Sequence, residues 1–258
     1  MIPYHDENAT LRTAWVTLAL VATNVLAWIF VQGGGATVPL ATSVCNFGLI
    51  PGELTLSVPP GAGFPMGDNL VCLTDPGRQS LNVITSMFLH GGWMHLIGNM
   101  WFLWLFGNNV EDSMTRPRFI VFYLLCGLAA ALLQVMIEPD SVIPMVGASG
   151  AISGVMGAYL VLYPRVRVFT FVPLGFFITS IALPAWGMLI YWMVIQLLGG
   201  FTRIGSGQEG GVAFWAHVGG FIAGVVLVKL FENRRRVESH RAQHWEPERV
   251  GWQRDSWS

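Results

Sequence analysis

Uncharged, mostly apolar stretches recur along this chain and are separated by short polar or charged segments. A helix needs about 20 apolar residues to cross the hydrocarbon core of a bilayer, and several stretches approach that length. They are residues 13–31, 93–110, 119–137, 149–163, 184–199 and 212–230. The pattern therefore predicts an all-α membrane protein, a bundle of six transmembrane helices.

Two of these stretches depart from the usual pattern. Residues 149–163 are short for a span, so we expect this helix to be tilted or to begin inside the bilayer. Residues 168–202 carry no charge and are too long for one span, but Pro173 and Pro184 interrupt them. Because proline tends to begin or break helices, we begin the fifth span near Pro184 and interpret 168–183 as an apolar segment skirting the membrane.

The composition supports a membrane protein and disfavours other classes. Hydrophobic residues make up 53% of the chain and charged residues 11%, whereas soluble domains carry about 25% charged residues. The formal net charge of −1 offers no excess of basic residues, so we expect no nucleic acid among the partners. A soluble protein with a very large apolar core is the weaker alternative, because the uncharged stretches have the length of spans.

Lysine and arginine near the span ends orient the chain, because cytoplasmic loops carry an excess of them. With a cytoplasmic N-terminus, the outer loops carry only Arg78 and Arg203, and the inner segments carry Arg116, Arg118, Arg165, Arg167, Lys229, Arg234, Arg235 and Arg236. We therefore expect a cytoplasmic tail at 1–12, a six-span domain at 13–232 and a polar, flexible cytoplasmic tail at 233–258. A cleaved signal peptide is the alternative for the first span.

The cysteines give no sign of a metal site, because no CxxC or CxxH pattern is present. The topology places Cys45 and Cys72 in one long extracytoplasmic loop at 33–79, in a compartment that permits disulfides. A Cys45–Cys72 bond would close this loop and could order it. Two free cysteines are the alternative.

Strongly polar side chains inside spans are costly, so each is a candidate functional residue. The chain carries His95 and Asn99 in the second span, Ser149 and Ser153 in the fourth, and His217 in the sixth. The topology brings all of them to the outer half of the bilayer. Hydrogen bonding between helices is the simpler interpretation. A metal site is disfavoured, because asparagine is a poor ligand for transition metals and no carboxylate lies at this depth.

Ser149 and His217 together favour nucleophilic catalysis. A serine hydroxyl is a weak nucleophile until a base takes its proton, and neutral imidazole is the usual base near pH 7. Ser149 is expected at a helix N-terminus, where free backbone N–H groups favour an anion such as a tetrahedral oxyanion. His95 and Asn99 could donate to the same oxygen.

Glycines give the fourth and sixth spans surfaces that can pack closely. Small residues four positions apart let membrane helices approach one another, and the two spans carry Gly150, Gly154, Gly157, Gly220 and Gly224. Such faces alone indicate only helix packing. Here their register with a serine on one helix and a histidine on the other would bring the two side chains within hydrogen-bond distance.

Four motifs together resemble the rhomboid family of intramembrane serine proteases, in its bacterial six-span form. They are FLHGGWMHLIGNM (88–100), FGNNVED (106–112), GASG (147–150) and WAHVGGFIAG (215–224). The resemblance implies six helices around a water-filled cavity open to the extracytoplasmic side. It also implies cleavage of transmembrane proteins in the lipid bilayer of the bacterial inner (plasma) membrane, with no metal or organic cofactor.

The matching positions imply a role for each candidate residue. Ser149 falls on the nucleophile and His217 on the general base. Asn99 and His95 fall on the side chains that stabilise the oxyanion, and Gly147 falls on the turn that shapes the oxyanion hole. A rhomboid-like protein that binds membrane helices without cutting them would lack a catalytic residue. A transporter or channel would favour paired carboxylates or discontinuous repeats, which this chain lacks.

One position departs from the family pattern. Members often carry an aromatic residue, commonly tyrosine, four residues after the nucleophile, where it packs on the base. This chain has Ser153 there. We expect either that Ser153 hydrogen-bonds the imidazole of His217 or that a neighbouring aromatic residue, Trp215 or Phe214, packs on it.

Overall fold

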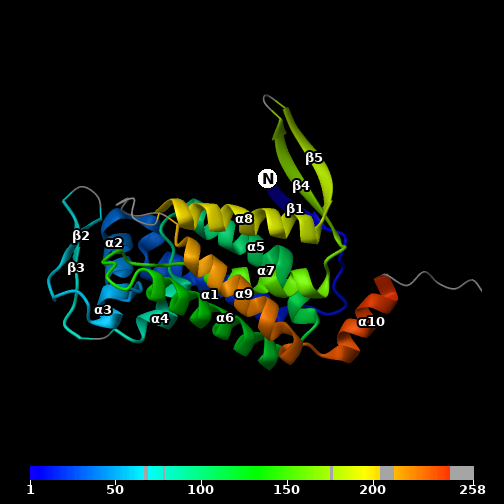
Figure 1. The fold of residues 1–258 in the computed structure, drawn as a ribbon, viewed down its shortest axis with the longest axis horizontal. Helices are drawn as coiled ribbons and strands as arrows, with labels where there is room; N and C mark the ends of the chain where they lie inside the picture. The colour runs from blue at the N-terminus through cyan, green and yellow to red at the C-terminus, as the bar shows by residue number, and fades with distance from the viewer. Residues whose placement is uncertain (67–68, 78, 175–176, 204–211, 245–258) are drawn as a thin grey trace, which may run out of the picture.

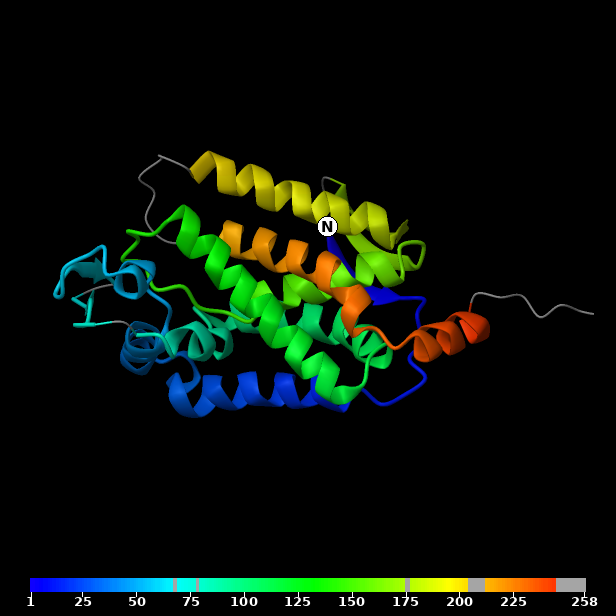
Figure 2. The same ribbon diagram turned by 60° about the horizontal axis from the view of Figure 1, so that its bottom comes forward.

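A bundle of helices makes up most of this protein (Figure 1). The computed structural model describes residues 1–66, 69–77, 79–174, 177–203 and 212–244. The bundle contains α1 (Trp15–Leu26, continued by the π-helical turn Ala27–Val31), α5 (Trp93–Asp112), α6 (Arg116–Ile137), α7 (Ser149–Leu162), α8 (Ala185–Arg203) and α9 (Phe214–Phe231). Helix α7 contacts α5, α6, α8 and α9. Figure 2 shows α8 and α1 on opposite sides of the bundle.

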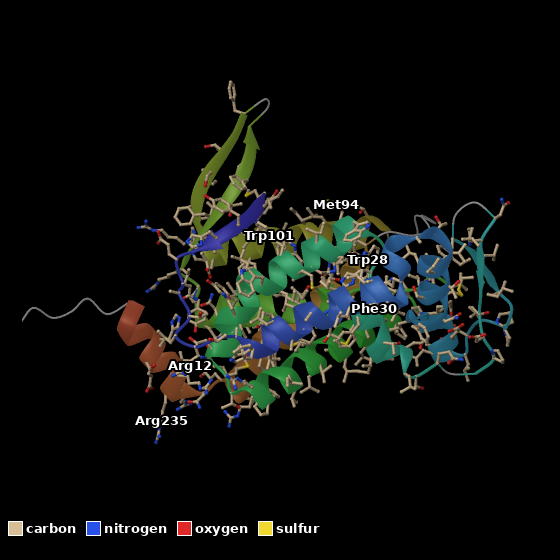
Figure 3. All side chains as sticks on the ribbon, turned by 180° about the vertical axis from the view of Figure 1, so that it is seen from behind. Arg12, Trp28, Phe30, Met94, Trp101 and Arg235 are labelled. Carbon is tan, nitrogen blue, oxygen red and sulfur yellow. A yellow bond between two sulfur atoms is a disulfide. The ribbon has the colours of Figure 1, made fainter. Side chains whose placement is uncertain are left out.

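The described helices include three that are long and apolar enough to cross a membrane, namely α6, α8 and α9; α1 with its extension and α7 are apolar but shorter. The protein is therefore a multi-pass membrane protein. Large apolar side chains on the outside of the bundle, such as Phe30 (78% exposed) and Met94 (81% exposed), have the character of a lipid-facing surface. The arginines Arg12 and Arg235 lie together towards one end (Figure 3).

The all-α prediction is wrong for this region, because residues 168–174 and 177–183 lie in two β-strands; their position beside the membrane stays a prediction. Strands β4 (Arg167–Leu174) and β5 (Phe177–Pro184) pair antiparallel, and β1 (Ile2–Asp6) pairs with the other edge of β4. The strands are rich in the β-branched and aromatic residues that favour a pleated surface. The sheet stands at one end of the bundle (Figure 1), so part of the predicted N-terminal tail is built into the fold.

The prediction of a flexible C-terminal tail is also wrong for its first part, which forms helix α10 (Arg234–His244). The backbone N–H of Asn233 donates to the carbonyl of Ser113 at 2.8 Å, and the ring of His240 bonds the carbonyl of Ala9 at 3.1 Å. These bonds hold the start of the tail against the same end of the bundle. Residues 245–258, the rest of the predicted tail, lie outside the described residues.

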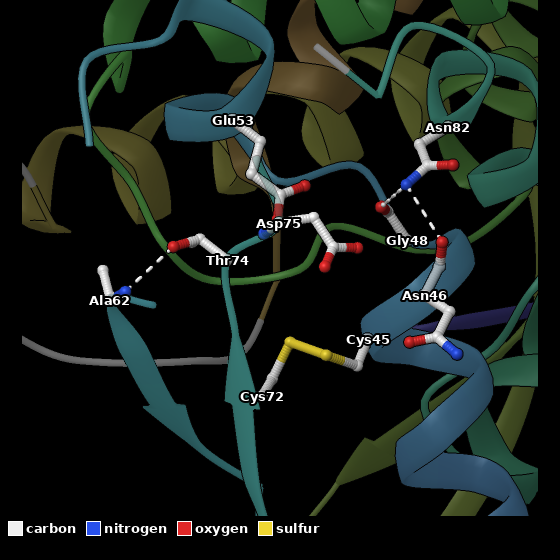
Figure 4. Close-up of a disulfide and its surroundings, with 9 residues drawn as sticks. All are labelled: Cys45, Asn46, Gly48, Glu53, Ala62, Cys72, Thr74, Asp75 and Asn82. Carbon is white, nitrogen blue, oxygen red and sulfur yellow. Dashed lines mark hydrogen bonds between the residues drawn. A yellow bond between two sulfur atoms is a disulfide. The ribbon is translucent and has the colours of Figure 1, made fainter. Parts of the chain in front are cut away.

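The long connection after α1 is ordered by short elements and one disulfide. It contains η2 (Gly33–Gly35), α2 (Thr37–Phe47), α3 (Pro51–Thr55), β2 (Gly63–Pro65), β3 (Val71–Leu73), α4 (Asn82–Thr85) and η3 (Ser86–Phe88). A Cys45–Cys72 disulfide joins α2 to β3 (Figure 4). Nearby, the Asn82 side chain donates to two backbone carbonyls, and Glu53 accepts from the Asp75 N–H at 2.6 Å. Positions 67–68 and 78 of this loop, including Arg78, lie outside the described residues.

At the opposite end, Glu111 ties α5 to the start of α1. Its carboxylate accepts the backbone N–H groups of Val16 at 2.9 Å and Thr17 at 2.7 Å, and the Thr17 hydroxyl at 2.9 Å. These N–H groups have no partner inside their own helix, because the first turn lacks preceding carbonyls. A side chain from another helix thus completes the first turn of α1.

Candidate active site

The glycine faces of α7 and α9 meet as the sequence predicts. A Cβ atom placed on Gly220 would lie 1.9 Å from the carbonyl oxygen of Gly150, and one on Gly224 would lie 1.9 Å from that of Gly154. Any side chain at these positions would force the helices apart. The two backbones therefore approach as closely as glycine allows, and this approach sets the distance between the residues at the end where both helices begin.

Ser149 and His217 lie at that end, within hydrogen-bond distance. Ser149 is the first residue of α7, and His217 lies one turn into α9. The Ser149 Oγ is 2.8 Å from the His217 Nε2. The nucleophile and base implied by the sequence are thus adjacent, although 68 positions separate them along the chain.

A glutamine from α8 contacts the other side of the histidine ring. The Nδ1 of His217 is 2.7 Å from the Oε1 of Gln196, whose residue is 7% exposed. An amide oxygen can only accept a hydrogen bond, so Nδ1 carries the proton. This assignment leaves Nε2 without a proton, and Nε2 can therefore accept the one on the Ser149 hydroxyl.

His95 is held in the complementary tautomer. Its Nδ1 accepts the backbone N–H of Gly91 at 3.2 Å, so its Nε2 carries the proton and can donate. That Nε2 faces Gly147, because a Cβ on Gly147 would lie 2.8 Å from it and 3.5 Å from the Ser149 Oγ. Gly147 also has a φ of +126°, a conformation that favours glycine.

Asn99 is a buried donor without a partner. It is 6% exposed, and its Nδ2 makes no hydrogen bond within the described part of the chain. Buried amides are almost always hydrogen-bonded, so an unpaired one needs an explanation. No side chain caps the N-terminus of α7 either. Both features suit a site that receives an oxyanion, where donors wait for a charge that develops during the reaction.

The space directly beside Ser149 is small. Its volume is about 20 Å³, and the residues around it include Ser86, Met87, Gly147, Gly150 and Ala216. This is enough for about one water molecule. A wider cavity, filled with water and open to the extracytoplasmic side, stays a prediction.

The structure does not bring Ser153 to the base. Its hydroxyl donates to the carbonyl oxygen of Ser149, one turn back, at 2.6 Å. Serine inside a helix commonly makes this bond. The predicted aromatic neighbour is also a different residue, because Trp192 of α8 lies beside the imidazole with ring centroids 5.7 Å apart. Trp215 instead packs edge-on against Phe201 at 5.2 Å.

Gln196 and Trp192 are therefore the site residues that the sequence prediction missed. A signal for Gln196 was present, since it is a polar amide inside the uncharged fifth stretch, where such groups need a partner. Trp192 gave no such signal in the sequence, because tryptophan is common throughout this chain. In the described ranges, no three His, Cys, Asp or Glu side chains gather as metal ligands would.

Known proteins match this chain over the same region. The rhomboid domain profile matches residues 77–234. Rhomboid protein 1, mitochondrial, of Saccharomyces cerevisiae is 27% identical over 181 residues, 65% of this chain and 47% of that protein. Rhomboid-like protease 5 of Toxoplasma gondii is 31% identical over 170 residues, 64% of this chain and 18% of that protein.

A bacterial relative matches a shorter region. Rhomboid protease GluP of Bacillus subtilis is 37% identical over 78 residues, 30% of this chain and 15% of that protein. The matched part of this chain therefore spans less than half the length of each of these relatives. Because the domain profile covers more than half of the chain and includes α5 to α9, the chain belongs to the rhomboid family.

Proposed function

We propose that this protein is an intramembrane serine endopeptidase that hydrolyses peptide bonds in or near the transmembrane segments of other membrane proteins. The observation that carries the proposal is the continuous contact from Ser149 Oγ to His217 Nε2 at 2.8 Å and from His217 Nδ1 to Gln196 Oε1 at 2.7 Å. It provides a nucleophile with a base in the correct tautomer, inside a protein of apolar helices.

The chemistry would proceed in two steps. His217 takes the hydroxyl proton while the Ser149 oxygen attacks the carbonyl carbon, and a tetrahedral oxyanion forms. The imidazolium then gives its proton to the leaving amine nitrogen as the peptide C–N bond breaks, which leaves an ester on Ser149. Water attacks this ester while His217 takes one of its protons. The imidazolium then returns that proton to the Ser149 oxygen as the ester C–O bond breaks, and the carboxylic acid product leaves and ionises.

Asn99, His95 and the first backbone N–H of α7 would stabilise the oxyanion. The Asn99 amide is unpaired in the resting protein, and the protonated Nε2 of His95 faces Gly147 beside the serine. Donors that are already in place need no reorganisation when charge develops, which makes such groups effective in a water-poor site.

We further propose that the spans and tails are arranged as the positive-inside rule predicts. Both termini would lie in the cytoplasm of a bacterium, and Ser149 would open towards the extracytoplasmic side of its inner membrane. The end that carries Arg12 and Arg235 would then be the cytoplasmic end.

Labelling with a fluorophosphonate probe in detergent tests the proposal directly. The probe should label the purified protein, and Ser149→Ala and His217→Ala should abolish labelling. Ser153→Ala is the matched control, because it removes a buried hydroxyl one turn away that contacts the Ser149 carbonyl and not the base. An unlabelled wild-type protein of normal thermal stability would instead favour a rhomboid-like protein that binds membrane helices without cutting them.

A further inference from the structure

We propose that Gln196 is the positioning residue that fixes the tautomer and orientation of the general base; this inference rests on the proposed protease function. His217 has two ring nitrogens, and each has one partner: Nε2 faces Ser149 and Nδ1 faces Gln196. The partner of Nδ1 decides which nitrogen can accept the proton of the serine.

In the described part of the chain, Gln196 is the residue that bonds the Nδ1 of His217. Among the described residues, no carboxylate bonds either ring nitrogen of His217, and Ser153, four residues after the nucleophile, donates to a backbone carbonyl. The titratable group that acts electrostatically on the ring is His95 of α5. Helix α6 reaches α9 near the base through Gln134, whose neutral amide oxygen accepts the N–H of Ala216 and not the ring.

Helix α8 contacts the ring twice. Gln196 and Trp192 are four residues apart and so lie on one helix face. Gln196 bonds Nδ1 while the Trp192 ring lies beside the imidazole, tilted by 36° with centroids 5.7 Å apart. The hydrogen bond to Gln196 fixes the rotation of the imidazole and keeps its proton on Nδ1. The indole of Trp192 limits how far the imidazole can tilt.

An uncharged amide at Gln196 suits a position inside a membrane protein. A carboxylate bonded to Nδ1 would orient the base equally well, but an ionised acid inside a membrane is costly. Glutamine offers the same accepting oxygen without a charge. A neutral partner also stabilises the imidazolium less than a carboxylate would, so the base keeps its proton less firmly and more of it is ready to act near pH 7.

The test compares three variants in proteoliposomes that contain a cleavable transmembrane substrate, with kcat and KM measured across pH. Gln196→Met keeps the length of the side chain but has no strong acceptor, and should lower kcat by roughly 10²-fold with little change in KM. Gln196→Glu keeps the accepting oxygen and should retain more activity than Gln196→Met. In the pH profile of kcat/KM for Gln196→Glu, the acidic limb should move to higher pH, because a carboxylate beside Nδ1 stabilises the protonated imidazole.

Gln134→Met is the matched control, since it removes another buried amide that binds α9 next to the base. It should lower thermal stability and leave the acidic limb in place. If the role of Gln196 is purely structural, Gln196→Glu should behave like Gln134→Met and leave the acidic limb of the pH profile of kcat/KM where it is in the wild type. An unshifted acidic limb in Gln196→Glu would therefore overturn the inference. So would a Gln196→Met variant with wild-type kcat.

Failure of the inference differs from failure of the proposed function. If fluorophosphonate labels the wild type but not Ser149→Ala, and the Gln196 variants match the wild type in kcat and pH profile, the protease proposal stands and the role of Gln196 is lost. If the folded wild type neither reacts with the probe nor cleaves, both are overturned.

Discussion

The centre of the bundle and the parts attached around it are packed in different ways. Helices α7 and α9 meet backbone to backbone, with glycine opposite glycine along the shared face. Helix α8 contacts α9 through larger side chains, since the Phe214 ring covers Gly199 and the Trp215 ring covers Gly200. Several large side chains of α8 are exposed, including Leu198 and Phe201.

The proposed active residues divide between these regions. Ser149 and His217, the proposed nucleophile and base, lie on the closely packed pair, so the 2.8 Å distance between them depends on glycine contacts that cannot relax. The partner of the base, Gln196, lies on the outer helix α8. The contact between the proposed nucleophile and base is thus set where two backbones meet, while the orientation of the proposed base depends on a side chain of an outer helix.

The largest predicted effect concerns the close contact between α7 and α9 at the centre of the bundle. Gly224→Ala places a Cβ 1.9 Å from the Gly154 carbonyl oxygen, and should destabilise the protein by about 3 kcal/mol or more, because neither backbone can yield. Gly187→Ala on α8 is the control, with Pro184 Cγ at 3.7 Å from the new Cβ. We expect it to be neutral or slightly stabilising, as alanine favours helices. Thermal midpoints in detergent measure both, and equal losses would contradict the distinction.

The second prediction concerns Asn99, a proposed oxyanion donor whose loss should leave the packing of the helices unchanged. Asn99→Ala removes a buried amide that has no partner in the resting protein, so thermal stability should change little. Turnover should fall on the order of 10²- to 10³-fold, because one donor to the oxyanion is lost. Kinetics on a transmembrane substrate and a melting curve provide the two readouts. A stability loss that accounts for the whole activity loss would argue against an oxyanion role.

The third prediction concerns the loop that the Cys45–Cys72 disulfide closes. Replacing both Cys45 and Cys72 with serine removes a link between positions 27 apart, and loops of this size gain about 3.5 kcal/mol from a crosslink in the chain-entropy treatment. The loop should become sensitive to proteases, while fluorophosphonate labelling of Ser149 persists. Limited proteolysis with and without reductant measures the effect. Loss of labelling together with loop cleavage would mean that the loop supports the active site.

The smallest predicted effect lies in the N-terminal strand. Asp6 accepts hydrogen bonds from Tyr159 at 2.5 Å and Asn109 at 3.0 Å, and burial raises its pKa from 3.8 to about 6. The folded protein therefore binds this proton more tightly than the unfolded chain does. Its contribution to stability is fully present below about pH 4, declines as the pH rises to 6, and is absent above that.

Melting midpoints between pH 4 and 7 test this slope. Asp6→Asn should flatten it, because the amide does not titrate. Glu7→Gln, which removes a carboxylate from the adjacent residue without touching the bonds of Asp6, should leave the slope in place. An unchanged slope in Asp6→Asn would assign the pH dependence to another group.

Much of the helical bundle could be predicted from the sequence, because each apolar stretch is defined by local composition. The β4–β5 pair could not, since an uncharged apolar run fits a strand buried on both sides as well as a membrane segment. Its partner β1 is also more than 160 positions away in the chain, as the pairing of Ile2 with Phe171 shows. Local patterns carry no information about a pairing of that kind.

The candidate site could likewise be predicted from the sequence only in part. Ser149, His217 and their glycine neighbours follow from spacing within single helices, and the structure brings them together. The partner of the base depends on how α8 is rotated against α9, which helix periodicity does not specify. The polar character of Gln196 marked it as unusual for a span, but only the fold shows that its oxygen points at the imidazole.

The pairing of β1 with β4 has a consequence for biosynthesis. Residues 2–6 leave the ribosome well before their partner strand, which begins at Arg167. At about 5–20 residues per second, the first strand waits roughly 10–30 s for its neighbour. Helices α1, α5, α6 and α7 are all made during that interval. Closure of the sheet is thus a late step, and until β4 has been made the N–H and C=O groups of β1 lack their strand partner.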